Sequence, residues 1–240
     1  MTDLVGKVAV ITGGSKGIGR AIARALHDAG ADVALCSRDE SEAMRTAEEL
    51  SSGGGGRALG IAADVRRLED VKRLIAGAVA EFGGLDILIA NAGVGGGFGP
   101  VHEIDPEDWH RVIDTNLTGV YNCCHEAVPE LEKRGGGWII TIGSLAGRYA
   151  FAGGTAYNTS KFGLLGFTEA LMLDLRDRGI RVSCIMPGSV DTHFNDSEPS
   201  GESWKLAPDD VARAVTQMLA HEGRALPSRV ELRPSQPKRK

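Results

Sequence analysis

The stretch Lys7–Gly19, KVAVITGGSKGIG, decides the fold of this chain. Its first part, Lys7–Thr12, is a short β-branched apolar run, which predicts a strand buried on both faces. The glycine-rich turn that follows, TGGSKGIG, leads straight into a helical pattern. Such a turn lets a diphosphate approach the backbone, and the helix start offers unpaired amides and a positive dipole end. The stretch therefore predicts a nucleotide site, for which the alternative is a plain turn.

The same alternation of strand and helix patterns runs through the whole chain. Six further apolar runs are expected as strands: Asp32–Ser37, Ala58–Ala62, Leu85–Ala90, Trp138–Ile142, Ile180–Met186 and Ser228–Leu232. The stretches between them carry helical periodicity. Seven strands alternating with six helical segments predict an α/β fold, a single doubly wound Rossmann domain over residues 1–240 with a seven-stranded parallel sheet flanked by helices. The basic tail, residues 234–240, is expected to be a frayed terminus.

Composition limits the classes of partner. The chain of 240 residues carries a formal net charge of -5. A mildly acidic balance argues against nucleic acid and anionic membrane as main partners. No apolar stretch approaches the roughly 18 residues of a membrane span, so a cytoplasmic protein is expected. The four cysteines lack the spacing of a metal site, so we interpret them as reduced, with no metal: Cys36, Cys123, Cys124 and Cys184.

Four polar residues form a candidate catalytic set: Asn116, Ser144, Tyr157 and Lys161. If residues 155–175 form a helix, Tyr157 and Lys161 are four apart and share one face. A lysine ammonium beside a tyrosine hydroxyl favours the phenolate, which would lower the tyrosine pKa from about 10 and allow proton transfer near neutral pH. Ser144 could hold a substrate oxygen. The alternatives are an exposed helix face, a helix-capping or helix-kinking Asn116 and a turn hydroxyl at Ser144.

The end of the second expected strand bears on the type of nucleotide. Ser37 and Arg38 stand where an acidic residue commonly meets the ribose in NAD-binding proteins. A guanidinium pairs well with phosphate oxygens, and Lys16 could add a second positive charge, which favours NADP(H) over NAD(H). In the alternative interpretation both are solvated surface charges and Asp39 binds the ribose. An Arg38→Asp substitution should swing the preference towards NAD(H).

Together these pieces resemble the short-chain dehydrogenase/reductase family, the compact branch with a Ser-Tyr-Lys-Asn set. The resemblance covers about residues 5–232. Besides the glycine turn and the catalytic set, it rests on three short motifs: Asp64-Val65, Asn91-Ala92-Gly93 and the run PGSVDT at residues 187–192. Within this family, the chain is similar to the 3-oxoacyl-carrier-protein reductases and the carbonyl reductases. A departure is Ala90, where the family often has a first asparagine.

The resemblance implies a role for each matching residue. Tyr157 would be the general acid or base, Lys161 would tune it and bind the nicotinamide ribose, and Ser144 would orient the substrate oxygen. Asn116 would hold a water of a proton relay. The implied cofactor-binding residues are Gly13, Ser15, Lys16, Gly17, Ile18, Gly19, Ser37, Arg38, Asp64, Val65, Asn91, Gly93, Tyr157, Lys161, Pro187, Gly188, Val190 and Thr192. Asp64 could instead be a strand-end turn residue.

The expected substrate site is open, because the chain between Thr192 and Leu206 is shorter than in many relatives. Its expected wall consists of six residues, which surface packing would explain equally well: Arg148, Tyr149, Phe151, His193, Phe194 and Trp204. The expected helix 155–175 is apolar nearly all round, which predicts a homo-oligomer, a dimer or a homotetramer.

The predicted function is an NADP(H)-dependent oxidoreductase that interconverts a ketone or aldehyde and an alcohol by hydride transfer. A carrier-protein reductase is the first alternative, although the ending VELRPSQPKRK lacks the Gly-Gly of many such enzymes. A non-catalytic cofactor sensor is the second.

Overall fold

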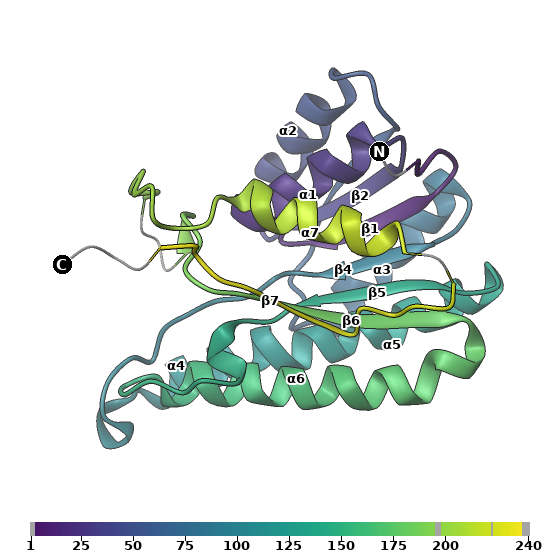
Figure 1. Cartoon of the computed structure of the whole chain (residues 1–240). Helices are drawn as coiled ribbons and strands as arrows, with labels where there is room; N and C mark the ends of the chain where they lie inside the picture. Colours follow the sequence, from purple (N-terminus) through teal and green to yellow (C-terminus); the bar gives the residue numbers. More distant parts are fainter. Residues whose placement is uncertain (1–2, 195–197, 222, 237–240) are drawn as a thin grey trace.

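A seven-stranded parallel sheet forms the centre of the molecule (Figure 1). The structure is a computed structural model that describes residues 3–194, 198–221 and 223–236. The strands are β1 (Val8–Thr12), β2 (Asp32–Ser37), β3 (Ala58–Ala62), β4 (Ile87–Ala90), β5 (Gly137–Ile142), β6 (Ile180–Pro187) and β7 (Arg229–Leu232). All seven strands expected from the sequence are present, with small shifts of their ends.

The strand order is β3-β2-β1-β4-β5-β6-β7. The chain therefore moves outward from β1 to β3, returns to pair β4 with β1, and then moves outward in the other direction. Ile11 of β1 aligns with Leu35 of β2 on one side and with Ile89 of β4 on the other. The strand order thus reverses its direction between β1 and β4, and doubly wound sheets bind ligands outside the carboxyl ends of the strands at such a reversal.

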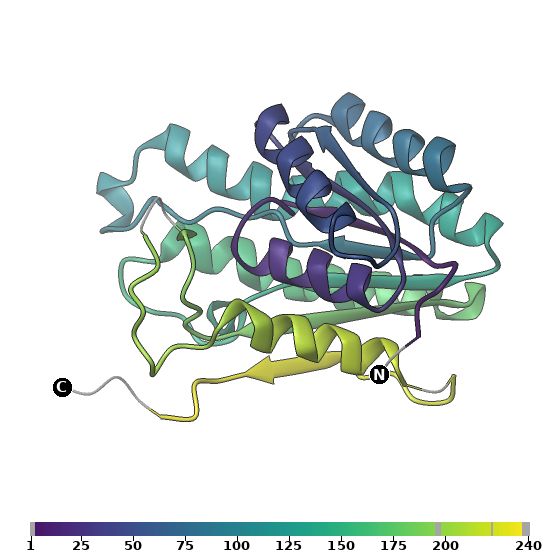
Figure 2. The same ribbon diagram turned by 90° about the horizontal axis from the view of Figure 1, so that it is seen from above.

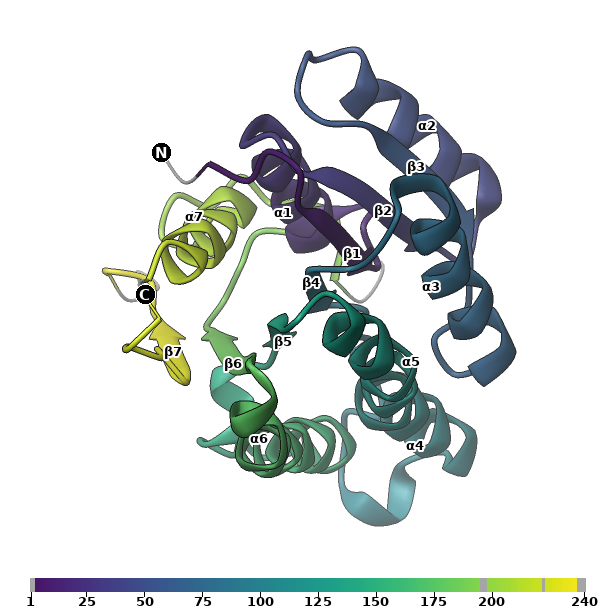
Figure 3. The ribbon, with the colours of Figure 1, turned by 90° about the vertical axis from the view of Figure 1, so that its right-hand side faces the viewer.

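Helices cover both faces of the sheet (Figure 3). One face carries α1 (Gly17–Asp28), α2 (Glu40–Ser51) and α7 (Pro208–Leu219), and α1 and α7 lie side by side in Figure 2. The other carries α3 (Leu68–Phe82), α5 (Gly119–Lys133) and α6 (Thr155–Leu175), with α4 (Pro106–Ile113) beside α6. Side chains alternate along the strands, so that Ile11 and Ile140 pack under α1 and α7, whereas Val10 and Ile139 pack under α3, α5 and α6.

Local sequence signals explain where several helices begin. The Asp105 carboxylate accepts a hydrogen bond from the Glu107 amide at 2.8 Å, and Pro106 is the first residue of α4. Pro208 opens α7 in the same way, and its fixed φ and missing amide suit that position. The described residues also form three single-turn 3-10 helices, Val101–Glu103, Leu145–Gly147 and Arg176–Arg178, and a π-helical turn, Asp114–Thr118.

The structure bears on the expectations about the cysteines, about membrane spans and about the C-terminal tail. The four cysteines are buried and unpaired. Within the described residues, none of the helices combines the length and the apolar character that crossing a bilayer requires. Of the tail expected to fray, residues 237–240 lie outside the described residues.

Candidate active site

The predicted site residues gather at one edge of the sheet, in the loops that follow the carboxyl ends of the strands, at the left in Figure 1. Parallel strands all end on this edge, so six loops distant in sequence meet there. These loops hold Gly13–Gly19 after β1, Ser37 and Arg38 after β2, Asp64 and Val65 after β3, Asn91 and Gly93 after β4, Ser144 after β5 and Gly188–Thr192 after β6.

The turn between β1 and α1 requires glycine at several positions. Gly13 and Gly17 have φ angles of 63° and 52°, in the left-handed region that other residues avoid. Gly19 has no room for a side chain, since a Cβ there would lie 2.1 Å from the Gly13 carbonyl oxygen. Asn91 Nδ2 donates to the carbonyl oxygens of Thr12 and Gly13 at 2.8 and 3.1 Å. The turn is therefore fixed to the loop after β4.

Thr12 contributes to this junction and was not predicted as a site residue. Its buried hydroxyl oxygen accepts hydrogen bonds from the Asn91 and Ala92 amides, each at 3.0 Å. A hydroxyl can satisfy two amides of a neighbouring loop while staying in the interior. A threonine at the end of an otherwise apolar strand is the sequence signal that could have indicated this role.

The N-terminus of α1 is suited to an anionic group. The side chain of its N-cap residue, Lys16, makes no capping hydrogen bond among the described residues, and its first turn contains no acidic residue. In contrast, α2 begins with Asp39, whose carboxylate accepts from the Glu42 amide at 3.0 Å. Uncapped first-turn amides and the helix dipole favour a phosphate. Thr192 lies over this turn, because a Cβ on Gly17 would be 3.3 Å from the Thr192 Cβ. The observed turn thus fits the diphosphate of a dinucleotide.

The cations near the end of β2 differ in their surroundings. Among the described residues Arg38 makes no hydrogen bond or ion pair, and its side chain is exposed. Lys16, in contrast, forms an ion pair with Glu42, whose second oxygen lies 3.4 Å from the Ser15 hydroxyl. Asp39, the alternative ribose ligand, already serves as the N-cap of α2.

Asp64 and Val65 follow β3 as predicted. The Asp64 carboxylate pairs with the Arg66 guanidinium, and this hydrogen bonding holds the pKa of Asp64 below its usual value. The Asp64 amide donates to Asp70 at 3.1 Å, so Asp64 also serves as the strand-end turn residue of the alternative interpretation. Val65 is buried, and its carbonyl oxygen accepts from Asn122 at 2.9 Å.

Ser144, Tyr157 and Lys161 come together beside the carboxyl end of β5. The Ser144 hydroxyl is hydrogen-bonded to the Tyr157 side chain and also accepts from the Ala146 amide at 3.1 Å. The Lys161 Nζ lies 5.8 Å from the centre of the Tyr157 ring and donates to the Ile142 carbonyl oxygen at 3.0 Å. The bounds of α6, Thr155–Leu175, confirm the expected helix that places Tyr157 and Lys161 one turn apart.

The pKa of Tyr157 differs from the expectation. Desolvation raises it above 10.0, and the hydrogen bond with Ser144 only partly opposes this effect. The lowering expected from Lys161 is not found, because the Lys161 ammonium is itself desolvated and is directed to the Ile142 carbonyl. Lys161 is only 6% exposed, and burial lowers its own pKa to about 8. In this structure the pair therefore consists of a protonated phenol and a lysine that can release its proton near neutral pH.

Asn116 lies in a π-helical turn, Asp114–Thr118, that joins α4 to α5. The wider turn is a common feature of functional sites, and here Asn116 is completely buried. Its Oδ1 accepts from the Val94 amide at 2.7 Å, and its Nδ2 donates to the Val94 carbonyl and to Ser160 at 2.8 and 3.0 Å. The side chain is thus used to hold the loop after β4, a positioning role that the sequence did not indicate.

Gly93 lies between Asn116 and Lys161. A Cβ at this position would be 3.3 Å from Asn116 Oδ1 and 3.6 Å from Lys161 Nζ. The absence of a side chain lets the backbone at Gly93 approach Asn116 and Lys161 closely, so three of the predicted residues lie in one small region.

Only two of the six predicted wall residues lie in the aromatic group around Tyr157. Phe194 lies with its ring centre 5.7 Å from that of Tyr157, and Phe151 is 6.1 Å from Phe98, which in turn is 6.2 Å from Tyr157. Phe98 was not predicted. A single aromatic residue inside the glycine run at residues 95–99 is the signal that could have found it.

The other four wall residues have their contacts elsewhere. Arg148 donates to Glu231 at 2.8 Å, and the Tyr149 ring packs against the guanidinium of Arg233 at 4.8 Å. His193 lies 3.4 Å from Glu198, and Trp204 packs against Lys205.

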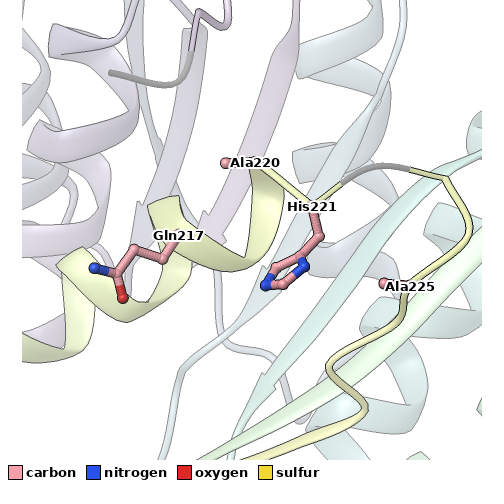
Figure 4. Close-up of a pocket in the computed structure, with 4 residues that line it drawn as sticks. All are labelled: Gln217, Ala220, His221 and Ala225. Carbon is pink, nitrogen blue, oxygen red and sulfur yellow. The ribbon is translucent and has the colours of Figure 1, made fainter.

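The segment after β6 is fastened by backbone bonds. The Gly188 amide donates to the Leu232 carbonyl oxygen at 2.8 Å, and Val190 forms a β-bridge with Leu206. A hollow at the C-terminal end of α7 is lined, among the described residues, by Gln217, Ala220, His221 and Ala225, and we assign it no chemistry (Figure 4).

Comparison with known proteins agrees with this arrangement. The short chain dehydrogenase family model matches residues 7–203. Dehydrogenase/reductase SDR family member 4 of Homo sapiens is 39% identical over 192 residues, which cover 80% of this chain and 69% of that protein. The cis-4-hydroxycyclohexanecarboxylate dehydrogenase of Sinomonas cyclohexanicum is 35% identical over 87% of each chain.

Solved structures extend the likeness to nearly the whole chain. The alcohol dehydrogenase of Thermococcus sibiricus, complexed with 5-hydroxy-NADP, has a TM-score of 0.91 and 30% identity over 98% of this chain and 99% of its own. The 3-ketoacyl-(acyl-carrier-protein) reductase of Brucella melitensis, complexed with NADH, has a TM-score of 0.88 and 28% identity over 97% of this chain and 99% of its own. The seven-stranded doubly wound sheet, the glycine turn and the family match agree, and the chain belongs to the short-chain dehydrogenase/reductase family.

Proposed function

We propose that the protein is an NADP(H)-dependent oxidoreductase that interconverts a ketone or aldehyde and an alcohol, with one domain for cofactor and substrate. The observation that carries the proposal is the grouping of Ser144, Tyr157 and Lys161 beside a glycine turn suited to a dinucleotide. Relatives support the reaction class, since one is named as an alcohol dehydrogenase and another as a dehydrogenase of a hydroxy acid.

In this proposal the nicotinamide cofactor, when bound, supplies or accepts the hydride at the substrate carbon. Tyr157, whose raised pKa keeps it protonated at neutral pH, donates its proton to the carbonyl oxygen as that oxygen gains negative charge. Ser144 orients this oxygen by a hydrogen bond. One C–H and one O–H bond are thereby formed, and the carbonyl becomes an alcohol.

Lys161 can then restore the proton of Tyr157. Its pKa of about 8 is close enough to neutral pH for transfer towards the phenolate. We expect Lys161 also to bind the nicotinamide ribose. Asn116, whose side chain is engaged with Val94 and Ser160, would act by holding the loop after β4, and the water of the implied relay would bind through other atoms.

We expect the cofactor to lie along the carboxyl edge of the sheet. The residues we assign to it are Gly13, Ser15, Lys16, Gly17, Ile18, Gly19, Ser37, Arg38, Asp64, Val65, Asn91, Gly93, Tyr157, Lys161, Pro187, Gly188, Val190 and Thr192. NADP(H) rather than NAD(H) is supported by Arg38, which forms no ion pair among the described residues and can pair with a 2′-phosphate.

The decisive experiment is the Tyr157→Phe substitution. Loss of the proton donor should reduce the rate of ketone reduction by about a thousandfold, within the usual range for general acid catalysis, and leave NADPH binding unchanged. NADPH oxidation would be followed by absorbance with a panel of ketones, and NADPH binding by fluorescence titration. Activity within tenfold of the original would refute the assignment of Tyr157.

Cofactor preference has its own test. Arg38→Asp should lower the affinity for NADPH, because it removes a charge-assisted hydrogen bond to the 2′-phosphate, and raise that for NADH, because a carboxylate can accept from the ribose hydroxyl. The ratio of the two dissociation constants should change by about a hundredfold. A ratio that stays the same would show that Arg38 does not meet the 2′-phosphate.

A carrier-protein reductase is the second candidate, and it is favoured by the structural likeness to the Brucella melitensis enzyme. Rates on free and carrier-linked thioesters would separate it from a small-molecule reductase. A cofactor sensor without turnover would retain NADPH binding and oxidise no NADPH with any ketone.

We also propose a cytoplasmic homo-oligomer. The outer side of α6 exposes Phe162 and Leu173, and Tyr121 of α5 is exposed as well, so a second copy of the chain could cover them. A monomer in light scattering at micromolar concentration would contradict this.

A further inference from the structure

Phenylalanine side chains dominate the surroundings of Tyr157. The rings of Phe98 and Phe194 lie 6.2 and 5.7 Å from that of Tyr157, tilted by 58° and 63°, and Phe151 lies 6.1 Å from Phe98. These distances and angles are typical of packed aromatic pairs. The three phenylalanines come from three different loops, those after β4, β5 and β6, so the grouping is formed only by the fold.

Phe151 packs against Phe98, and Phe98 and Phe194 each pack against Tyr157, yet all three phenylalanines are open to solvent. Phe98, Phe151 and Phe194 are 49%, 48% and 39% exposed. Half-exposed aromatic rings gathered around one point form an apolar patch of the kind that marks a binding site. A ligand that covered them would gain the apolar area that the protein leaves uncovered.

The backbone holds Phe98 in its place. Gly97 and Gly99, on either side, have φ angles of 58° and 151°, and a Cβ on Gly97 would lie 3.4 Å from the Ala156 Cβ. The Gly99 amide donates to the Gly153 carbonyl oxygen at 2.8 Å, which ties the loop of Phe98 to the loop of Phe151. The position of the ring is therefore defined by the glycines and is not that of a free loop tip.

Two arginines in the loops and helices near the rings form ion pairs with described residues. Arg111 pairs with Asp108 at 2.7 Å and donates to the Gly95 carbonyl oxygen at 3.2 Å, so it supports the glycine run from beneath. Arg148 pairs with Glu231. Among the residues that the structure describes, these two guanidinium groups are therefore already paired and do not offer a free charge to a ligand at the three rings.

Building on the proposed oxidoreductase function, we propose that Phe98, Phe151 and Phe194 select uncharged ketones that bear a ring, aryl or alicyclic, and that Phe98 is the main determinant of this preference. The ring of the substrate lies against the three phenylalanines, and the carbonyl group meets Tyr157 and Ser144. Small aliphatic ketones reach the same polar groups without covering the rings.

The test compares kcat/KM for acetophenone, cyclohexanone and 2-butanone with NADPH. The unaltered enzyme should prefer acetophenone, and Phe98→Ala should lower its kcat/KM at least tenfold through KM, with 2-butanone changed less than twofold, because loss of apolar burial of this size typically costs ten- to two-hundredfold. Phe98→Leu should restore part of the loss. Val101→Ala, which removes another exposed apolar side chain of the same region, is the matched control and should change neither rate.

A selectivity ratio that is the same in Phe98→Ala and in the unaltered enzyme would overturn the proposal, as would a preference for a charged ketone such as pyruvate. Binding of acetophenone to the protein loaded with oxidised NADP, which has no hydride to transfer to the ketone, would be followed by saturation-transfer NMR and decides the matter without turnover. If no ketone is reduced, the proposed function fails. The apolar site is then judged by whether Phe98→Ala abolishes binding, and unchanged binding would refute it.

Discussion

The cofactor side and the substrate side of the site are built in different ways. On the cofactor side, the turn after β1 is held by backbone geometry, with Gly19 packed on Gly13 and Asn91 bonded to two carbonyl oxygens. On the substrate side, exposed rings such as Phe98 and Phe194 surround Tyr157. A substitution on the first side should therefore affect folding and all substrates, whereas one on the second should affect only some substrates.

The largest effect that would sharpen this contrast is expected from Gly19→Ala. A Cβ only 2.1 Å from the Gly13 oxygen and 2.5 Å from Asn91 Nδ2 forces the turn and its neighbouring loop apart. We expect cofactor affinity to fall at least about a hundredfold and the free energy of unfolding to fall by about 2 kcal/mol, a typical cost of overpacking. NADPH titration and urea unfolding would measure both quantities.

Gly166→Ala is the matched control for that substitution. Gly166 lies in α6 and a Cβ there would meet nothing within 4 Å. Removal of a helical glycine should stabilise the protein by about 0.5 to 1 kcal/mol and leave cofactor affinity unchanged. If Gly19→Ala and Gly166→Ala had the same effect on cofactor affinity and on unfolding, the turn after β1 would not be sterically fixed, and the proposed difference between the two sides of the site would be wrong.

This difference also explains what the sequence could predict. The glycine spacing and the strand positions depend on neighbours close in the chain, and so the strands, α6 and the turn after β1 were predicted correctly. The position of Phe98 beside Tyr157 depends on three separate loops, and the raised pKa of Tyr157 depends on how deeply its hydroxyl is desolvated. The pairing of Lys16 with Glu42 likewise joins the glycine turn to α2, and no local pattern relates these two segments.

Lys161 stands on the boundary between the two sides and provides a test through pH. Burial lowers its pKa from 10.5 to about 8, so between these values the unfolded chain binds more protons than the folded one. The free energy of unfolding should therefore rise with pH across this window. Below pH 8 the folded protein bears the full cost of the buried charge, which is at most about 3 kcal/mol.

Lys161→Met removes that charge at similar length. At pH 7 this variant should be more stable than the unaltered protein by up to about 3 kcal/mol, less the contribution of the hydrogen bond to Ile142, and the difference should shrink towards pH 10. Urea unfolding at several pH values measures it. If the free energy of unfolding of the two proteins changed with pH in the same way, Lys161 would not be desolvated in the folded protein, and this prediction would be wrong. Reduction of ketones should fall in the variant at every pH.

The smallest effect concerns Glu42, where the cofactor side depends on a side chain and not on the backbone. Glu42 pairs with Lys16 and lies close to the Ser15 hydroxyl, so it engages the second cation that the sequence offered for the 2′-phosphate besides Arg38. Its negative charge should oppose a phosphate bound by Arg38. Glu42→Gln should therefore raise the affinity for NADPH relative to NADH by about threefold, in keeping with the modest strength of exposed ion pairs.

Glu49→Gln is the control for Glu42→Gln, because Glu49 lies on the same helix and pairs with Arg20 and Arg45. Glu49→Gln removes the same negative charge from α2 but does not touch the Lys16 pair, so the ratio of the NADPH and NADH affinities should stay constant. Since salt screens exposed charges, the increase in NADPH affinity in Glu42→Gln should shrink at high ionic strength. A fall in NADPH affinity would instead mean that Glu42 orients Lys16 for the phosphate. Backbone geometry and side chains would then both contribute to binding the cofactor. The cofactor side and the substrate side would in that case differ only in how much each depends on side chains.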